Sequence, residues 1–179
     1  MRLAMAFGLA ALPILFAAPL AHAGAGPFDE VKLGLLAHDV PIGGDSREAG
    51  LDVNGEVLFV SPDLFAPLWA PRPHLGVTVN TDGKNSYAYG GLTWTTNLPA
   101  SFFADLGLGG AIHDGPDVSA QEHHKGLGTR VLFHESVEFG YRLSEQHSIA
   151  AFLDHISNAD LAKTNPGLTN LGLRLGIAF

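Results

Sequence analysis

Cysteine is absent from the 179 residues of this chain, and positively charged residues are few. Without cysteine, a disulfide framework and a thiolate metal site are both excluded. The chain carries 10 Lys and Arg against 18 Asp and Glu, for a formal net charge of −8. Because affinity for nucleic acid depends on clustered Lys and Arg, this balance argues against a nucleic-acid partner.

Long apolar runs are confined to the N-terminus. Residues 1–23 combine Arg2, an apolar stretch and the small-x-small ending Ala21-His22-Ala23, which is the pattern of a secretory signal peptide. A permanent N-terminal membrane helix is the alternative, and Pro13, Pro19 and that ending disfavour it. We therefore expect a signal peptide over 1–23 and one exported domain over 24–179, a length typical of a single domain.

The remaining chain alternates apolar with small or polar residues, and no later apolar run could form a membrane-spanning helix. Alternation with period two is typical of strands that have one apolar face. Turn-forming segments divide the pattern into eight predicted strands, over residues 30–38, 51–59, 75–80, 86–96, 102–113, 131–142, 149–157 and 171–179.

The connection Ser61–Pro73 contains four prolines and the apolar run Leu64-Phe65-Ala66-Pro67-Leu68-Trp69. Tryptophan is enriched at membrane–water interfaces, so one interpretation places this connection near a membrane surface. A loop packed on an ordinary core is the alternative.

The residues on the non-apolar face separate a membrane barrel from a soluble sandwich. Small and polar residues on that face suit the narrow lumen of an eight-stranded barrel, and the Leu, Val and Phe face suits lipid. They are Gly172, Arg174, Gly176, Asp105, Gly107, Gly109, Ser136, Glu138 and Arg142. The last strand ends in Phe179 and resembles the closing strand of bacterial outer-membrane barrels. We predict an all-β fold, an eight-stranded antiparallel transmembrane β-barrel, over a soluble exported β-protein.

His155 and Ser157 share one face at the end of the predicted strand 149–157, together with Leu153. Histidine can take the proton of a serine hydroxyl, which then attacks an ester. The alternative is that both polar side chains simply meet lipid headgroups and water at the membrane interface.

The segment Asp154-His155-Ile156-Ser157-Asn158-Ala159, the later Asn165-Pro166-Gly167 and the strand that ends at Phe179 resemble the lipid A 3-O-deacylases of the PagL type. Gly128–Arg142 is similar to the preceding strand of that family. The resemblance implies an outer-membrane barrel with outer loops at 39–50, 82–84, 113–128 and 158–169. It also implies that His155 is the base, Ser157 the nucleophile and Asn158 an oxyanion-hole residue.

One position departs from the family. Its acid, about fourteen residues after the histidine, is replaced here by Thr169, which carries no charge. If Tyr141 lies opposite Ile149, then Glu135 lies opposite His155 and is our candidate third catalytic residue. Asp160 is the second choice, and an interfacial carboxylate that binds water or a cation is the alternative reading of Glu135.

The resemblance implies hydrolysis of the 3-O-linked 3-hydroxyacyl chain of lipid A in the outer leaflet. The partners would be lipid A or lipopolysaccharide and membrane lipids, with a monomer or homodimer as the active form. We expect no cofactor and no metal site, because His123-His124 lacks partners at ligand spacing. The alternative function is a non-catalytic barrel for lipopolysaccharide contact, adhesion or membrane integrity.

Overall fold

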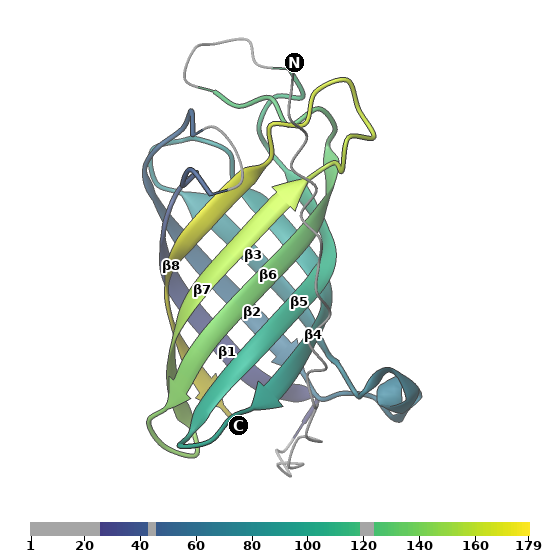
Figure 1. Ribbon diagram of the computed structural model, residues 1–179, viewed down its shortest axis with the longest axis vertical. Coiled ribbons are helices and arrows are strands. Elements are labelled where there is room, and N and C mark those ends of the chain that lie inside the picture. Colours follow the sequence, from purple (N-terminus) through teal and green to yellow (C-terminus); the bar gives the residue numbers. More distant parts are fainter. Residues whose placement is uncertain (1–25, 43–45, 119–123) are drawn as a thin grey trace, which may run out of the picture.

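The computed structural model describes residues 26–42, 46–118 and 124–179, so the predicted signal peptide and His123 lie outside the described residues. Eight strands follow one another in the order of the chain and form a closed barrel (Figure 1). They are β1 (Phe28–Ala37), β2 (Leu51–Phe59), β3 (Arg72–Asn80), β4 (Tyr87–Asn97), β5 (Phe102–His113), β6 (Val131–Arg142), β7 (His147–Ser157) and β8 (Leu168–Ala178). Among the described residues, no helix is long and apolar enough to cross a membrane.

Closure depends on the pairing of the first strand with the last. β1 and β8 are antiparallel, with Leu35 opposite Leu173 and Val31 opposite Ile177. Because β1 also pairs with β2, no strand of the barrel has a free edge. The predicted eight-stranded antiparallel barrel is therefore confirmed.

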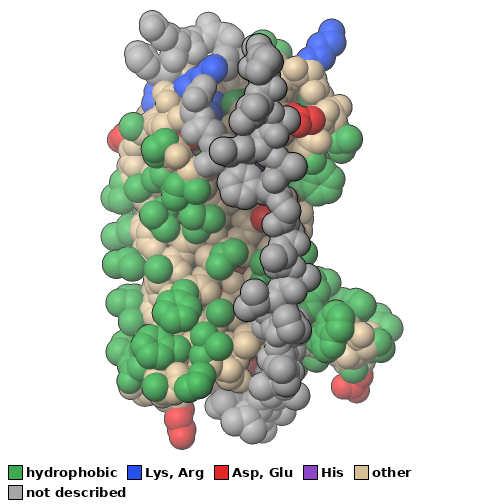
Figure 2. All heavy atoms as spheres, in the orientation of Figure 1, with side chains coloured by type: hydrophobic (Ala, Val, Ile, Leu, Met, Phe, Trp, Pro, Cys, Tyr) green, Lys and Arg blue, Asp and Glu red, His purple; other side chains and the backbone are tan. Residues whose placement is uncertain are grey.

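The apolar face of the strands points outward and the polar face points into the lumen. Leu33 and Leu173 are 58% and 61% exposed, whereas Lys32 and Arg174 are 1% and 2% exposed. Figure 2 shows hydrophobic side chains spread over the visible wall of the barrel. A soluble sandwich would bury its apolar faces between two sheets, so that alternative is wrong.

Charged side chains in the lumen pair across the barrel. The Lys32 ammonium lies 2.6 Å from Asp105 and 2.5 Å from Glu138, and Arg174 lies 2.6 Å from Glu56 and 3.0 Å from Glu138. These contacts connect β1, β2, β5, β6 and β8. Removing one member of such a buried network typically costs roughly 3–5 kcal/mol, because its partner is left unpaired.

Four strands begin earlier than the alternation predicts: β1 and β7 by two residues, and β3 and β8 by three. β3 starts at Arg72 and β8 at Leu168, rather than at 75 and 171. The second and third residues of β8 are polar, but Thr169 still pairs with His155 and Asn170 with Asp154 of β7. Backbone pairing with a neighbouring strand extends β8 beyond its apolar pattern. This correction takes Thr169 out of the predicted loop 158–169.

Long connections gather at one end of the barrel, here called the long-loop end. They follow β1, β5 and β7, and the shorter β3–β4 connection joins them there (Figure 1). At this end the imidazole of His38 lies between Asp52 and Glu48, at 2.8 Å from each. Glu48 also accepts a 2.6 Å hydrogen bond from the main-chain N–H of Lys125. The loops after β1 and β5 are thus joined through buried polar side chains.

A short 3-10 helix, η1 (Asp63–Leu68), projects sideways from the opposite end, between β2 and β3 (Figures 1 and 2). None of its residues is buried, and Leu64 and the following Trp69 are 81% and 68% exposed. The indole of Trp94 donates a 2.8 Å hydrogen bond to the carbonyl of Leu68 and holds η1 against β4. A loop packed on a core is therefore wrong, and an interfacial position is the interpretation that remains.

We predict that Trp69 lies at the membrane interface. In wild-type protein reconstituted in bilayers that contain brominated lipids, the Trp69 fluorescence, taken as the difference between wild type and Trp69→Phe, should be quenched relative to bilayers of unbrominated lipid. The Trp69→Phe variant reports the other tryptophan as a control. Emission typical of water-exposed indole, with no quenching, would contradict the interfacial position.

The His38 cluster should make stability depend on pH. Burial lowers the pKa of His38, but the hydrogen bonds to Asp52 and Glu48 outweigh it and raise the pKa from 6.5 to about 9. The stabilisation is complete below pH 6.5 and is lost as the pH rises through about 9. Between pH 7 and pH 10 the loss should be on the order of 2–3 kcal/mol. Thermal unfolding measured at pH 7 and at pH 10 tests this prediction. From pH 7 to pH 10, Tm should decrease less in His38→Gln than in wild type. Equal decreases in the two proteins would refute the prediction.

Candidate active site

Three side chains from three adjacent strands form one row on the outward face of the barrel. Glu135 of β6 lies opposite His155 of β7, and His155 lies opposite Thr169 of β8. Tyr141 lies opposite Ile149, as the predicted register requires. Directly opposed residues that share a face have Cβ atoms roughly 5 Å apart. The row therefore places a carboxylate and a hydroxyl on either side of the imidazole.

His155 is half-buried and is held through one ring nitrogen. Its Nδ1 lies 2.8 Å from the hydroxyl oxygen of Thr169. The Thr169 side chain is only 5% exposed, and its hydroxyl donates a 3.1 Å hydrogen bond to the carbonyl of Ile42, in the loop after β1. In the described part of the chain, Nε2 of His155 has no hydrogen-bond partner. Nε2 is therefore the nitrogen that is free to act as a base.

Ser157 follows two residues later on the same outward face, at the long-loop end of β7. It is half-buried and lies opposite Phe133 of β6. Within residues 26–42, 46–118 and 124–179 its hydroxyl makes no hydrogen bond, including none to His155. Hydrogen bonds between catalytic groups are often long or absent until the substrate binds. The two groups are neighbours, and both remain available for a substrate.

Glu135 supplies a negative charge directly across the strand pair from His155. Among the charged groups around His155, it has the strongest favourable electrostatic interaction with a protonated imidazole. Its Oε2 is buried and has no hydrogen-bond partner among the described residues, and Nδ1 of His155 bonds to Thr169 instead. Asp160, the second choice, is exposed in the loop after β7 and makes no described contact with His155. Glu135 thus acts on His155 through charge, without a direct hydrogen bond.

Asn158 is 3% exposed and anchors the loop after β7. Its side-chain amide donates 2.8 Å hydrogen bonds to the carbonyls of Leu127 and Thr164, and its main-chain N–H donates to Asn165 at 3.0 Å. Both amide hydrogens are therefore in use. In this conformation the side chain of Asn158 offers no free N–H to an oxyanion.

Gly167 leaves space beside the free nitrogen of His155. A Cβ at this position would lie 3.1 Å from Nε2 and 2.7 Å from Cε1 of the imidazole, and the backbone has φ +61°. Both the contact and the backbone angle disfavour other residues. Glycine therefore keeps this side of the ring open.

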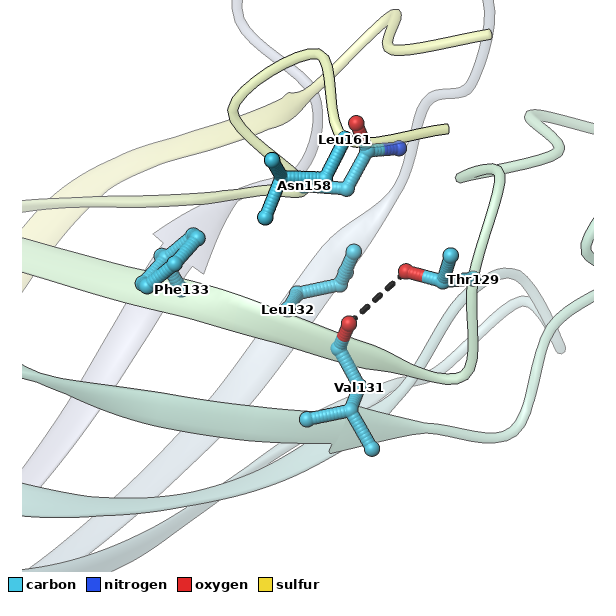
Figure 3. Close-up of a pocket in the computed structure, with 6 residues that line it drawn as sticks. All are labelled: Thr129, Val131, Leu132, Phe133, Asn158 and Leu161. Atoms are coloured by element: carbon cyan, nitrogen blue, oxygen red, sulfur yellow. Dashed lines mark hydrogen bonds between the residues drawn. The ribbon is translucent and has the colours of Figure 1, made fainter. Parts of the chain in front are cut away.

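A surface pocket of about 350 Å³ lies at the long-loop end (Figure 3). It is lined by Thr129, Val131, Leu132, Phe133, Asn158 and Leu161. Phe133, the residue opposite Ser157, contributes to its apolar wall. The site therefore combines a hydroxyl, a base and an apolar cavity on the lipid-facing side of the barrel.

The structure adds three contributors that sequence reasoning did not assign. By sequence, Thr169 is only a departure from the family, whereas in the structure its hydroxyl contacts His155. The Ile42 carbonyl contacts Thr169, and Gly167 lies beside the ring. Extending the alternation of Leu171–Phe179 backward by two residues would have placed Thr169 outward. No sequence signal indicates the Ile42 contact, because it joins a loop to a distant strand.

The described residues include no group of three or more His, Cys, Asp or Glu side chains that could hold a metal ion. His124 lies 3.8 Å from Glu48, whereas His123 lies outside the described residues. The side chains of the site offer an imidazole, which can transfer a proton, and a hydroxyl, which can act as a nucleophile.

Solved structures of outer-membrane barrels resemble this chain. The crystal structure of the outer membrane enzyme PagL matches with a TM-score of 0.61 and 17% identity, covering 84% of this chain and 99% of that one. Neisserial surface protein A matches with a TM-score of 0.54 and 9% identity, covering 87% and 98%. At these identities the likeness concerns the fold, and it places the chain among outer-membrane β-barrels.

Comparison of the sequence with protein-family models identifies a family as well as a fold. No curated protein matches this chain. The model of the family described as "Lipid A 3-O-deacylase (PagL)" matches residues 64–178, which is more than half of the chain and includes the row of Glu135, His155 and Thr169 as well as Ser157. The chain therefore belongs to the PagL family of lipid A 3-O-deacylases.

Proposed function

We propose that this protein is an outer-membrane esterase that hydrolyses the 3-O-linked 3-hydroxyacyl chain of lipid A. The observation that carries the proposal is the outward position of Ser157 and His155 beside an apolar pocket, at one end of a lipid-facing barrel. Ester groups of a lipid lie near the membrane surface, and its acyl chains extend into the hydrocarbon. A nucleophile on the outer wall of the barrel can reach such an ester without drawing the lipid into the lumen.

The reaction would proceed in two steps. Nε2 of His155 takes the hydroxyl proton of Ser157 as Oγ attacks the ester carbonyl, and it then gives the proton to the departing sugar hydroxyl. The acyl group stays on Ser157 as an ester. A water molecule, deprotonated by the same nitrogen, attacks this ester and releases the 3-hydroxy fatty acid, while the proton returns to Ser157.

Glu135 would stabilise the positive charge that His155 acquires in each step. A carboxylate on the same face of the neighbouring strand lowers the energy of an imidazolium without having to touch it. Because Oε2 of Glu135 is buried and has no hydrogen bond from the described residues, little competes for its charge. Glu135 is therefore our proposed acid in place of Thr169.

The oxyanion of the tetrahedral intermediate needs N–H donors. Asn158 can serve only if its amide exchanges the carbonyl of Leu127 or Thr164 for the substrate. The main-chain N–H groups of Ala159 and Asp160 are alternative donors beside it, because they make no hydrogen bond within the described part of the chain. The pocket bounded by Phe133 and Leu161 would receive part of the acyl chain.

We predict that Ser157→Ala and His155→Gln abolish deacylation. Mass spectrometry of lipid A from cells that express wild type should show loss of one 3-hydroxyacyl chain, and both variants should leave the acylation unchanged. His147→Gln is the matched control, since His147 lies exposed on the same strand at its opposite end and should not affect activity. Identical lipid A with wild type and Ser157→Ala would favour the non-catalytic barrel.

Glu135→Gln should lower kcat while the barrel stays folded. The amide keeps the shape of the side chain but removes the charge, so we expect a decrease on the order of 10-fold to 100-fold. Asp160→Asn is the control and should retain activity. Full activity in Glu135→Gln together with a large loss in Asp160→Asn would transfer the acid role to the loop.

A further inference from the structure

We infer that Thr169 is the positioning residue of the site: its hydroxyl holds His155 in the tautomer whose Nε2 is unprotonated. This inference rests on the proposed function. We infer that the two roles of a single catalytic acid are divided between β6 and β8, the strands on either side of β7. Thr169 of β8 orients the ring, and Glu135 of β6 supplies the charge.

The tautomer follows from counting hydrogens. Thr169 has one hydroxyl hydrogen, which it donates to the carbonyl of Ile42 at 3.1 Å. Its oxygen also lies 2.8 Å from Nδ1 of His155, and with its hydrogen already in use it can only accept there. Nδ1 of the neutral ring must therefore carry the proton, which leaves the lone pair on Nε2.

The Ile42 carbonyl is well placed to fix the direction of this hydrogen bond. A carbonyl oxygen can only accept, so it cannot reverse the chain of hydrogen bonds from His155 through Thr169. The loop that carries it is attached to β8, because Val40 N–H donates to the carbonyl of Thr169 at 2.7 Å and Asp39 N–H donates to Asn170 at 3.0 Å. The loop after β1 thereby becomes part of the active site.

The orientation of the ring also explains the requirement for Gly167. With Nδ1 bonded to Thr169, the Cε1–Nε2 edge of the ring faces Gly167, where a Cβ would lie 2.7 Å from Cε1 and 3.1 Å from Nε2. Glycine leaves this nitrogen accessible for proton transfer. Thr169 and Gly167 therefore act on the two nitrogens of one ring, the first holding Nδ1 and the second exposing Nε2.

Nuclear magnetic resonance of protein labelled with 15N-histidine tests the tautomer directly. In wild type at a pH where His155 is neutral, we expect its Nδ1 to be protonated, with the signals assigned by comparison with His155→Gln. Thr169→Val removes the hydroxyl at nearly constant shape and should let the Nε2-protonated form appear, whereas Thr169→Ser should not. An Nε2-protonated ring in wild type, or an unchanged tautomer in Thr169→Val, would overturn the inference.

Kinetics on lipid A provide the second readout. Thr169→Val should lower kcat on the order of 100-fold, with KM nearly unchanged, because only the correctly protonated fraction of His155 reacts. Thr169→Ser should recover most of the activity, and Glu135→Gln should lower kcat without changing the tautomer. Wild-type kcat in Thr169→Val would refute the positioning role.

The two proposals can fail separately. If wild type leaves lipid A unchanged, the proposed function fails, while the resonance experiment still decides whether Thr169 sets the tautomer. If wild type is active and Thr169→Val is equally active, the function stands and the inference fails. Unchanged heat-dependent gel migration of each variant would establish that its barrel is intact.

Discussion

Every other feature of this molecule depends on the closure of the sheet through the pairing of β1 with β8. In hydrocarbon, an unpaired backbone N–H or C=O costs several kcal/mol, so a sheet can cross a membrane only without edges. Closure also gives each strand one lumenal and one lipid-facing side. The alternation of residues then decides which side chains meet lipid, and it sends Leu33 and Leu173 outward and Lys32 and Arg174 inward.

Charged side chains on the lumenal face and on the outward face of the barrel differ in their pairing. In the lumen, Lys32 and Arg174 are paired with Asp105, Glu138 and Glu56, so their burial is compensated. On the outward face near the long-loop end, Glu135 forms no salt bridge with any described residue, and its buried Oε2 has no hydrogen-bond partner among them. A carboxylate beside lipid without full pairing is costly, and such positions are commonly functional. Among the charged groups that act on His155, Glu135 has the largest effect, which is consistent with a proposed role in catalysis.

Strand register assembles the proposed site from distant segments. Residues 135, 155 and 169 form a row because β6, β7 and β8 are adjacent and antiparallel, and the loop after β1 reaches the same place because closure makes β1 the neighbour of β8. The Ile42 carbonyl can contact Thr169 only in a closed barrel. The architecture that permits membrane insertion thus also brings the outer loop to the imidazole.

The alternation of residues by itself determined the number of strands, the division into lipid-facing and lumenal sides, and the shared face of His155 and Ser157. These properties are local, because side chains alternate along any extended chain. The opposition of Glu135 and His155 could also be predicted, since a short turn between β6 and β7 sets their register. Only the tertiary structure decided that Nδ1 of His155 bonds to Thr169 and that β8 starts at Leu168. It also decided that the side-chain amide of Asn158 donates its hydrogen bonds to loop carbonyls. Those outcomes depend on contacts between segments far apart in the chain, and no periodicity within one strand encodes them.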